Sequence, residues 1–270
     1  MQLNYKTYGT TGPHLVILHG LFGNLDNWQT LARRWATDYT VVLVDLRNHG
    51  RSPHAEEMTY PLMAQDIAEL LETLAIDRCH LLGHSMGGKV AMQAALSYPT
   101  LVSKLIVVDM APRQYGRGHD DVFAALHALD PATLGDRSEA DAAMQPHMAD
   151  AGVRQFLLKN LTRRDDAGFR WRMNLEVLDR DYEQLIAPIG TMGQIYPGPV
   201  LFVRGGKSDY VRDNDWPGVL ILFPQARLTT VARAGHWVHA ERPGELEGLV
   251  RAFLSEDLTG TPDPSGVPLT

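Results

Sequence analysis

The sequence has little of several things that would define other classes of protein. It holds a single cysteine, Cys79, so an internal disulfide is excluded, and the apolar residues around it predict a core side chain rather than a reactive thiol. Acidic residues outnumber basic ones, 32 to 25, and the net charge of -7 argues against nucleic acid as the main partner. No apolar run reaches the length of a membrane span, and residues 1–6 lack the apolar stretch of a signal peptide. We therefore expect a soluble, cytoplasmic protein.

Patterns for metals and nucleotides are also missing. Residues 235–239 lack the H-E-x-x-H spacing of zinc hydrolases, so we expect no metal and no cofactor. Residues 83–89 fit most of a phosphate-binding loop, but the next residue is Val90, where such a loop needs a Ser or Thr hydroxyl to hold magnesium. The sequence thus disfavours a nucleotide-binding module.

The most informative feature of the chain is the sequence Gly-His-Ser-Met-Gly-Gly at 83–88. It is a G-x-S-x-G pattern, preceded by the apolar run 79–82 and followed by a helical pattern over 86–97. A strand therefore enters a helix through a tight turn, in which Gly83 and Gly87 leave room and Ser85 faces a substrate. A serine hydroxyl placed in this way is a candidate nucleophile, and the start of the helix offers backbone N–H groups.

Alternating strands and helices predict an α/β fold with a mostly parallel, doubly wound sheet. Continuous apolar runs mark the expected strands, at 15–18, 40–44, 79–82, 105–108, 200–203 and 227–231. Amphipathic patterns mark the helices that flank them, at about 25–35, 61–74, 86–97 and 243–254. These segments define a core domain made of residues 1–111 and 200–255.

The alternation stops between residues 112 and 199. Helical segments are expected there instead, at about 119–129, 138–149, 153–164 and 174–186. A helical block inserted between two strands lies over the strand C-terminal ends, where open α/β sheets place their sites, so residues 112–199 are interpreted as a helical cap. Residues 256–270 are rich in proline, glycine and acid, and are expected to form a disordered tail.

The nucleophile needs an imidazole to accept its proton and a carboxylate to orient that imidazole. In folds with this serine turn the order along the chain is Ser, acid, His, and His236 follows the last predicted strand as the expected base. The acid has more than one candidate. Asp109 directly ends the strand after the nucleophile, whereas Asp209 follows a later strand, where the usual acid position falls on Ser208. We favour Asp109, with Asp209 as the alternative or auxiliary acid and a serine-assisted arrangement through Ser208 also open.

Attack on an acyl carbon creates an oxyanion, which preorganised N–H donors must stabilise. One expected donor is the N–H of Met86, directly after the nucleophile. The second should come from the glycine-rich loop His-Gly-Leu-Phe-Gly at 19–23, where Leu21 is the first choice and Phe22 the second.

Five separated motifs together resemble the α/β-hydrolase superfamily. In chain order they are HGLFG at 19–23, DLRNHGRS at 45–52, GHSMGG at 83–88, VDMAP at 108–112 and GHWVHAE at 235–241. The resemblance covers roughly residues 3–254 and is nearest to the small serine esterases of the YbfF-like group. It implies an esterase acting on short acyl esters, some thioesterase activity towards acyl-CoA, and an acid after the earlier strand, which supports Asp109. Asp209 stands where that group has a proline, so an auxiliary role for this carboxylate stays open.

The sequence thus predicts a serine carboxylesterase that hydrolyses small acyl esters through an acyl-serine intermediate at Ser85. Its partner would be a small-molecule ester or thioester. An acyl-CoA thioesterase with the same triad is one alternative, and basic residues between 159 and 172 would either anchor the phosphates of coenzyme A or form a solvated helix face. A non-catalytic ligand-binding protein of the same fold is the rival outside enzymes.

Overall fold

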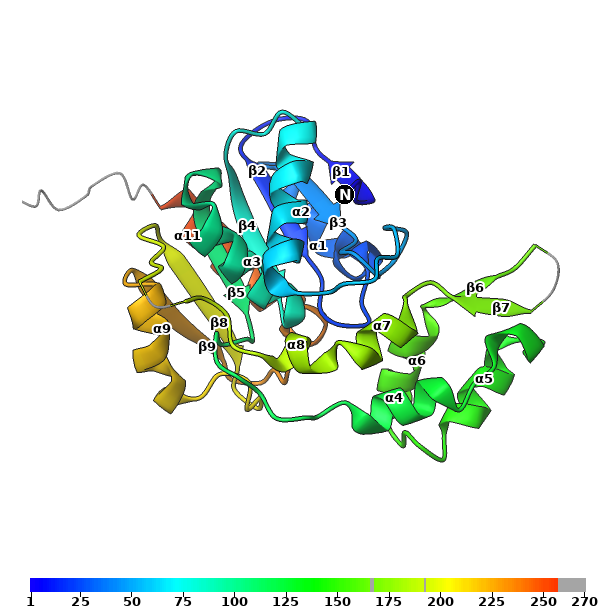
Figure 1. Cartoon of the computed structure of the whole chain (residues 1–270). Helices are drawn as coiled ribbons and strands as arrows, with labels where there is room; N and C mark the ends of the chain where they lie inside the picture. The colour runs from blue at the N-terminus through cyan, green and yellow to red at the C-terminus, as the bar shows by residue number, and fades with distance from the viewer. Residues whose placement is uncertain (166–167, 192, 257–270) are drawn as a thin grey trace, which may run out of the picture.

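The computed structural model describes residues 1–165, 168–191 and 193–256. Figure 1 shows one sheet flanked by helices, with a second group of helices, coloured green, to the lower right. Of the expected tail, residues 257–270 lie outside the described residues. Within the described ranges, no helix combines the length and the apolar character needed to cross a bilayer.

Seven strands form the main sheet, in the order β1-β3-β2-β4-β5-β8-β9. Their bounds are β1 Tyr5–Tyr8, β2 His14–Leu18, β3 Thr40–Val44, β4 Cys79–His84, β5 Val102–Val108, β8 Val200–Gly205 and β9 Ala226–Val231. β1 is antiparallel to β3, and the other neighbouring pairs are parallel. The predicted mostly parallel, doubly wound sheet is confirmed. β1 is not among the expected strands, because it is a largely exposed edge strand without an apolar run.

Helices cover both faces of the sheet, since successive side chains of a strand point to opposite sides. Val16 and Leu18 pack with α2 (Tyr60–Thr73) and α3 (Met86–Ser97), which lie in front of the sheet in Figure 1. Leu15 and Ile17 pack on the other face with α1 (Gln29–Trp35) and α11 (Pro243–Ser255). The remaining core helices are α9 Trp216–Leu222, α10 Val238–Glu241 and the 3₁₀ turns Leu25–Trp28, Pro99–Leu101 and Asp213–Asp215.

Between β5 and β8 the chain leaves the sheet. This segment holds α4 Asp120–His127, a 3₁₀ turn Pro131–Thr133, α5 Arg137–Met144, α6 Ala151–Leu158, β6 Leu161–Arg163, β7 Phe169–Trp171, α7 Leu175–Arg180 and α8 Tyr182–Ile186.

Two expectations for this segment are wrong. The helix expected at 153–164 ends at residue 158, because the Asn160 side chain bonds carbonyl groups, and β6 then pairs antiparallel with β7. The helix expected at 174–186 divides at Asp181, whose carboxylate accepts the N–H of Met58 at 3.1 Å. The segment is therefore mainly helical but includes a β-hairpin.

The fold gathers polar residues at one edge of the sheet. His19 follows β2, Ser85 follows β4 and Asp109 follows β5. Ser208 and His236 lie in the loops after β8 and β9. Because these strands are parallel, their C-terminal ends meet at the same edge, and the residues that follow them lie close together.

Candidate active site

Ser85 lies in the turn between β4 and α3, in a backbone conformation that most residues avoid. Its φ is 55° and its ψ is -124°. The neighbouring glycines make this turn possible: a Cβ on Gly83 would lie 2.1 Å from the Gly87 carbonyl oxygen, and one on Gly87 would lie 2.4 Å from the His19 carbonyl oxygen. The Ser85 N–H donates to the Val108 carbonyl at 3.1 Å, which ties the turn to β5. The turn therefore presents the hydroxyl above the strand ends.

Three side chains from three strand ends form a chain of hydrogen bonds. His236 Nε2 lies 3.0 Å from Ser85 Oγ, and His236 Nδ1 lies 2.8 Å from Asp109 Oδ2. Because a carboxylate only accepts, Nδ1 carries the proton, and Nε2 is left free to accept the proton of the serine hydroxyl. This is the tautomer that a base acting on serine requires.

Asp109 is wholly buried, and its carboxylate is compensated by several donors. Oδ1 accepts the Gly205 N–H at 2.9 Å, while Oδ2 accepts both the Ser208 hydroxyl and the His236 ring N–H. Donors at both oxygens offset the loss of water around a buried charge. The backbone of Asp109 has a φ of 50°, which turns its side chain away from the direction of the strand and toward these groups.

The two other acid candidates lie differently. Ser208 donates to the carboxylate of Asp109 rather than to the imidazole. Asp209 is exposed and lines a cavity next to Ser85, and among the described residues its carboxylate makes no hydrogen bond to His236. The structure thus brings Asp109 and Ser208 together with the histidine and leaves the Asp209 carboxylate apart.

Two contacts around His236 could not be read from the sequence. The Tyr210 ring stacks on the imidazole with centroids 3.9 Å apart and planes 20° apart. His84 Nε2 donates to the His236 carbonyl oxygen at 2.9 Å. Burial holds the pKa of His84 well below the usual value for histidine, so this ring stays neutral. Together these contacts fix the ring and the backbone of His236, and they arise only where the end of β4 meets the loops after β8 and β9.

The loop after β2 (residues 19–23, the β2 loop) lies next to Ser85, since a Cβ on Gly20 would lie 3.1 Å from the Cβ of Ser85. Leu21, Ser85 and Met86 line the same cavity, and Met86 begins α3, where a helix leaves its first N–H groups without intrahelical acceptors. Phe22, the second choice for the loop donor, already donates its N–H to a buried histidine ring at 3.2 Å. The geometry therefore favours Leu21 over Phe22 as a donor toward the cavity.

Two buried histidines join the β2 loop to the loop after β3 (residues 45–52, the β3 loop). His49 Nε2 accepts the Phe22 N–H, and His19 Nε2 accepts the Leu46 N–H at 3.1 Å. Each Nδ1 lies 3.0 Å or less from a backbone carbonyl oxygen and so carries the ring proton. Burial lowers the pKa of His19 to about 4 and that of His49 to about 3, so both rings are neutral acceptors at pH 7.

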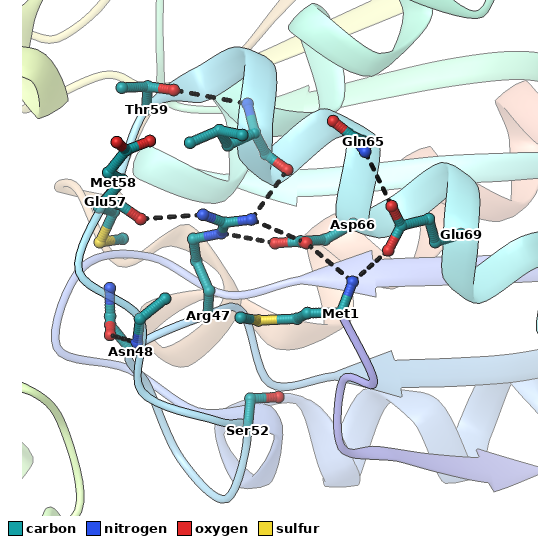
Figure 2. A network of polar contacts seen from close by, with 12 residues as sticks. Met1, Arg47, Asn48, Ser52, Glu57, Met58, Thr59, Gln65, Asp66 and Glu69 are labelled. Carbon is teal, nitrogen blue, oxygen red and sulfur yellow. Dashed lines mark hydrogen bonds and ion pairs between the residues drawn. The ribbon is translucent and has the colours of Figure 1, made fainter.

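A buried ion pair anchors the β3 loop in turn, as Figure 2 shows. Arg47 Nε lies 2.6 Å from Asp66 Oδ2 and Arg47 Nη2 lies 2.8 Å from Asp66 Oδ1. The guanidinium also donates to the Glu57 carbonyl oxygen at 2.8 Å. This bidentate pair fixes the β3 loop to α2, and through His49 it steadies the β2 loop beside Ser85.

Two cavities meet at Ser85. The smaller cavity has a volume of about 220 Å³ and the larger one about 340 Å³. Both are lined by Leu21, Ser85, Gly118, His119 and Tyr210. Lys159 and Arg172, the first and last of the basic residues between 159 and 172, line a separate hollow whose walls do not include Ser85. Over the described part of the chain, His, Cys, Asp and Glu side chains form no group of three or more that could hold a metal ion.

A mostly parallel sheet with a serine turn after β4 and a histidine after the last strand is the arrangement of the α/β hydrolases. The chain belongs to this family, since the family model for the alpha/beta hydrolase fold matches residues 13–243. The resemblance inferred from the five sequence motifs is thereby confirmed.

Within this family, the chain is similar to particular esterases and lipases. The chain is 38% identical to esterase YbfF of Escherichia coli over 95% of its own length and 100% of that protein. It is 41% identical to the sn-1-specific diacylglycerol lipase ABHD11 of Xenopus laevis, over 94% of this chain and 84% of that one. Among solved structures, a marine microorganism esterase superposes with a TM-score of 0.92 at 36% identity, over 93% of this chain and 99% of that one. The chain is a hydrolase that acts on ester bonds.

Proposed function

We propose that the protein is a serine carboxylesterase that hydrolyses small acyl esters through an acyl intermediate on Ser85. The observation that carries this proposal is the chain of hydrogen bonds from Ser85 Oγ through His236 to Asp109, at 3.0 and 2.8 Å. A serine alone is a weak nucleophile, and this arrangement lets an imidazole remove its proton as it attacks.

In the first step His236 Nε2 takes the Ser85 proton while Oγ attacks the carbonyl carbon of the ester. The negative oxygen of the tetrahedral intermediate accepts hydrogen bonds from the N–H groups of Leu21 and Met86, which stabilise charge that develops only during the reaction. The protonated His236 then gives its proton to the departing alcohol. In the second step water attacks the acyl-serine with His236 again as the base, and the protonated His236 then returns the proton to Ser85 Oγ as the carboxylic acid leaves.

Asp109 is the proposed orienting acid. It holds the proton-bearing Nδ1 of His236 and stabilises the imidazolium that forms after proton transfer. Ser208 supports this carboxylate by donating to the same oxygen that accepts from His236. Asp209 has no part in the proposed chemistry, because its carboxylate is exposed and the Nδ1 of His236 is bound to Asp109 instead.

Ser85→Ala tests the nucleophile. The variant should lose hydrolysis of p-nitrophenyl acetate and butyrate, by about 10⁶-fold in kcat, while circular dichroism shows an unchanged fold. A fluorophosphonate should label the parent protein and not the variant. Undiminished turnover by the variant would refute the role of Ser85. A folded parent that neither turns over esters nor reacts with the probe would favour the non-catalytic ligand-binding alternative.

Asp109→Asn and Asp209→Asn, measured side by side, test the acid. An amide at position 109 favours the wrong tautomer of His236, so kcat should fall by about 10⁴-fold, while the variant at position 209 should keep near-parent activity. A large loss confined to the variant at position 209 would show that the acid is wrongly assigned.

The thioesterase alternative uses the same groups, because a thioester carbonyl is attacked in the same way. A comparison of kcat/KM for butyryl-CoA and p-nitrophenyl butyrate separates the two substrates. We expect the oxygen ester to be preferred, since the hollow lined by Lys159 and Arg172 does not include the nucleophile.

A further inference from the structure

We propose that the larger cavity binds the alcohol part of the ester and the smaller cavity binds the acyl part. Substrates would then combine a short acyl group with a bulky, neutral and apolar alcohol. This inference rests on the proposed function, since it assigns the two sides of Ser85 to the two halves of the substrate.

The position of His236 decides which half of the substrate lies in which cavity. The imidazole must hand its proton to the oxygen of the departing alcohol, so that oxygen lies beside Nε2 and the rest of the alcohol extends along the wall that His236 forms. His236 and Trp237 line the larger cavity. The acyl chain leaves the carbonyl carbon on the opposite side, over Met86, which lines the smaller cavity.

The lining of the larger cavity indicates the chemistry of the alcohol. Apolar side chains from the β2 loop, the segment between β5 and β8 and the loop after β9 meet there, namely Phe22, Val122, Met148, Val153, Phe156 and Trp237. Burial lowers the pKa of His119 to about 4 and that of His239 to about 3, so these rings are neutral at pH 7. Asp121 also lines this cavity, and its described walls include no lysine or arginine, so an anionic leaving group would be poorly matched.

The smaller cavity limits the acyl group. Its volume of about 220 Å³ lies below the roughly 300–1,000 Å³ of sites that hold drug-sized ligands. Tyr60, Met110, Tyr115 and Leu185 contribute to its wall, and Tyr60 and Leu185 are themselves buried and packed. A short acyl chain fits this space better than a long one.

The test uses one variant in each cavity, and neither changes a residue of the proposed catalytic chain. Phe156→Ala removes a half-buried ring whose centroid lies 6.2 Å from that of Trp237 in the larger cavity. Gly116→Leu adds a side chain to the wall of the smaller cavity, where a Cβ would meet nothing within 4 Å. Val122→Ala is a second variant of the larger cavity, for use if Phe156→Ala does not fold.

The acyl-enzyme separates the two halves of the substrate, because the alcohol has already left when deacylation begins. We expect Phe156→Ala to change the ratio of kcat/KM for 2-naphthyl butyrate to that for methyl butyrate by about tenfold. The hydrolysis rate of its butyryl-enzyme, formed in a stopped-flow burst with p-nitrophenyl butyrate, should stay unchanged. Gly116→Leu should lower kcat/KM for p-nitrophenyl octanoate relative to acetate by about tenfold and should leave the 2-naphthyl to methyl ratio unchanged.

The opposite pattern would overturn the assignment: slower deacylation and altered acyl-length preference in Phe156→Ala, with altered alcohol preference in Gly116→Leu. Equal effects of both variants on both halves would overturn it as well, because one cavity would then hold the whole substrate. A parent protein without ester turnover and without fluorophosphonate labelling would instead refute the proposed function, and that control keeps the two failures distinct.

Discussion

Lys89 is fully buried in α3, one turn after Ser85, and takes no part in the proposed chemistry. Its Nζ donates to the carbonyl oxygens of Ile186, at 3.3 Å, and Ala187, and lies 4.8 Å from the centroid of the Tyr115 ring. It therefore ties α3 to the end of α8. Burial lowers the pKa of this lysine from 10.5 to about 7, with a smaller contribution from the positive charge of Arg113.

This lowered pKa makes the free energy of unfolding depend on pH. The direction of the dependence follows from the number of protons that the folded and the unfolded chain bind. Above pH 10.5 the amine is neutral in both the folded and the unfolded chain. Between pH 10.5 and about 7 the unfolded chain binds a proton that the folded chain does not, so the free energy of unfolding falls as the pH falls. The slope is about 1.4 kcal/mol per pH unit, or about 5 kcal/mol over the whole window. Below pH 7 the amine is protonated in both states and this contribution levels off.

Urea unfolding of the parent and of Lys89→Met at several pH values between 7 and 10 measures this effect. The stability of the parent relative to the variant should decrease by about 1.4 kcal/mol for each unit by which the pH is lowered. Other titrating groups contribute equally to both proteins and cancel in the comparison. Lys207→Met, which changes an exposed lysine, is the matched control for the loss of a lysine side chain. A difference between parent and Lys89→Met that stays constant over this range would refute the reasoning.

Three further predictions concern the support of the site. Ser208→Ala should lower kcat for p-nitrophenyl butyrate by about tenfold, far less than Asp109→Asn, because the carboxylate keeps its other donors. His49→Ala should lower kcat by about tenfold to a hundredfold with little change in KM, because the β2 loop loses the acceptor that holds it, and His49→Gln should restore part of the rate. Asp66→Asn should lower the free energy of unfolding in urea by about 3–5 kcal/mol, because Arg47 would keep its buried charge without a carboxylate.

The positions of Ser85 and His236 could be predicted because a parallel sheet gathers the C-terminal ends of its strands at one edge. An apolar run marks each strand, so a polar residue that directly follows such a run must lie at that edge. The glycines of the serine turn add a second constraint that is readable from the sequence. At Gly83 any Cβ would collide with the backbone of the next helix. A glycine at this position of the G-x-S-x-G pattern therefore indicates the tight turn.

The acid could not be fixed in the same way, since both Asp109 and Asp209 follow strands. The two aspartates differ in the paths of the loops that hold them, after β5 and after β8. Asp109 adopts a φ of 50° and turns its carboxylate toward Gly205 and Ser208, which are 96 and 99 residues further along the chain. Contacts over such distances depend on how the whole sheet is assembled, and local sequence carries no record of them.

The β-hairpin between β5 and β8 could not be predicted from the sequence for a related reason. The apolar residues of 153–164 recur with a helical period, yet α6 ends at residue 158. Asn160 lies just beyond that end and donates to the carbonyl oxygen of Phe22, 138 residues away, at 2.7 Å. A tertiary hydrogen bond thus overrides local propensity, which is a weak preference of less than about 1 kcal/mol per residue.

The hydrogen bond from Asn160 to Phe22 also connects the segment between β5 and β8 with the β2 loop. Phe22 has a φ of 59°, a conformation that needs outside support in a residue other than glycine. Its N–H is held by His49 from the core, and its carbonyl oxygen is held by Asn160 from the segment after β5. The Phe22 N–H belongs to the peptide unit that directly follows Leu21, the proposed oxyanion donor, so these contacts hold the backbone next to that donor. The segment between β5 and β8 therefore helps to hold the β2 loop, from which the proposed oxyanion donor comes.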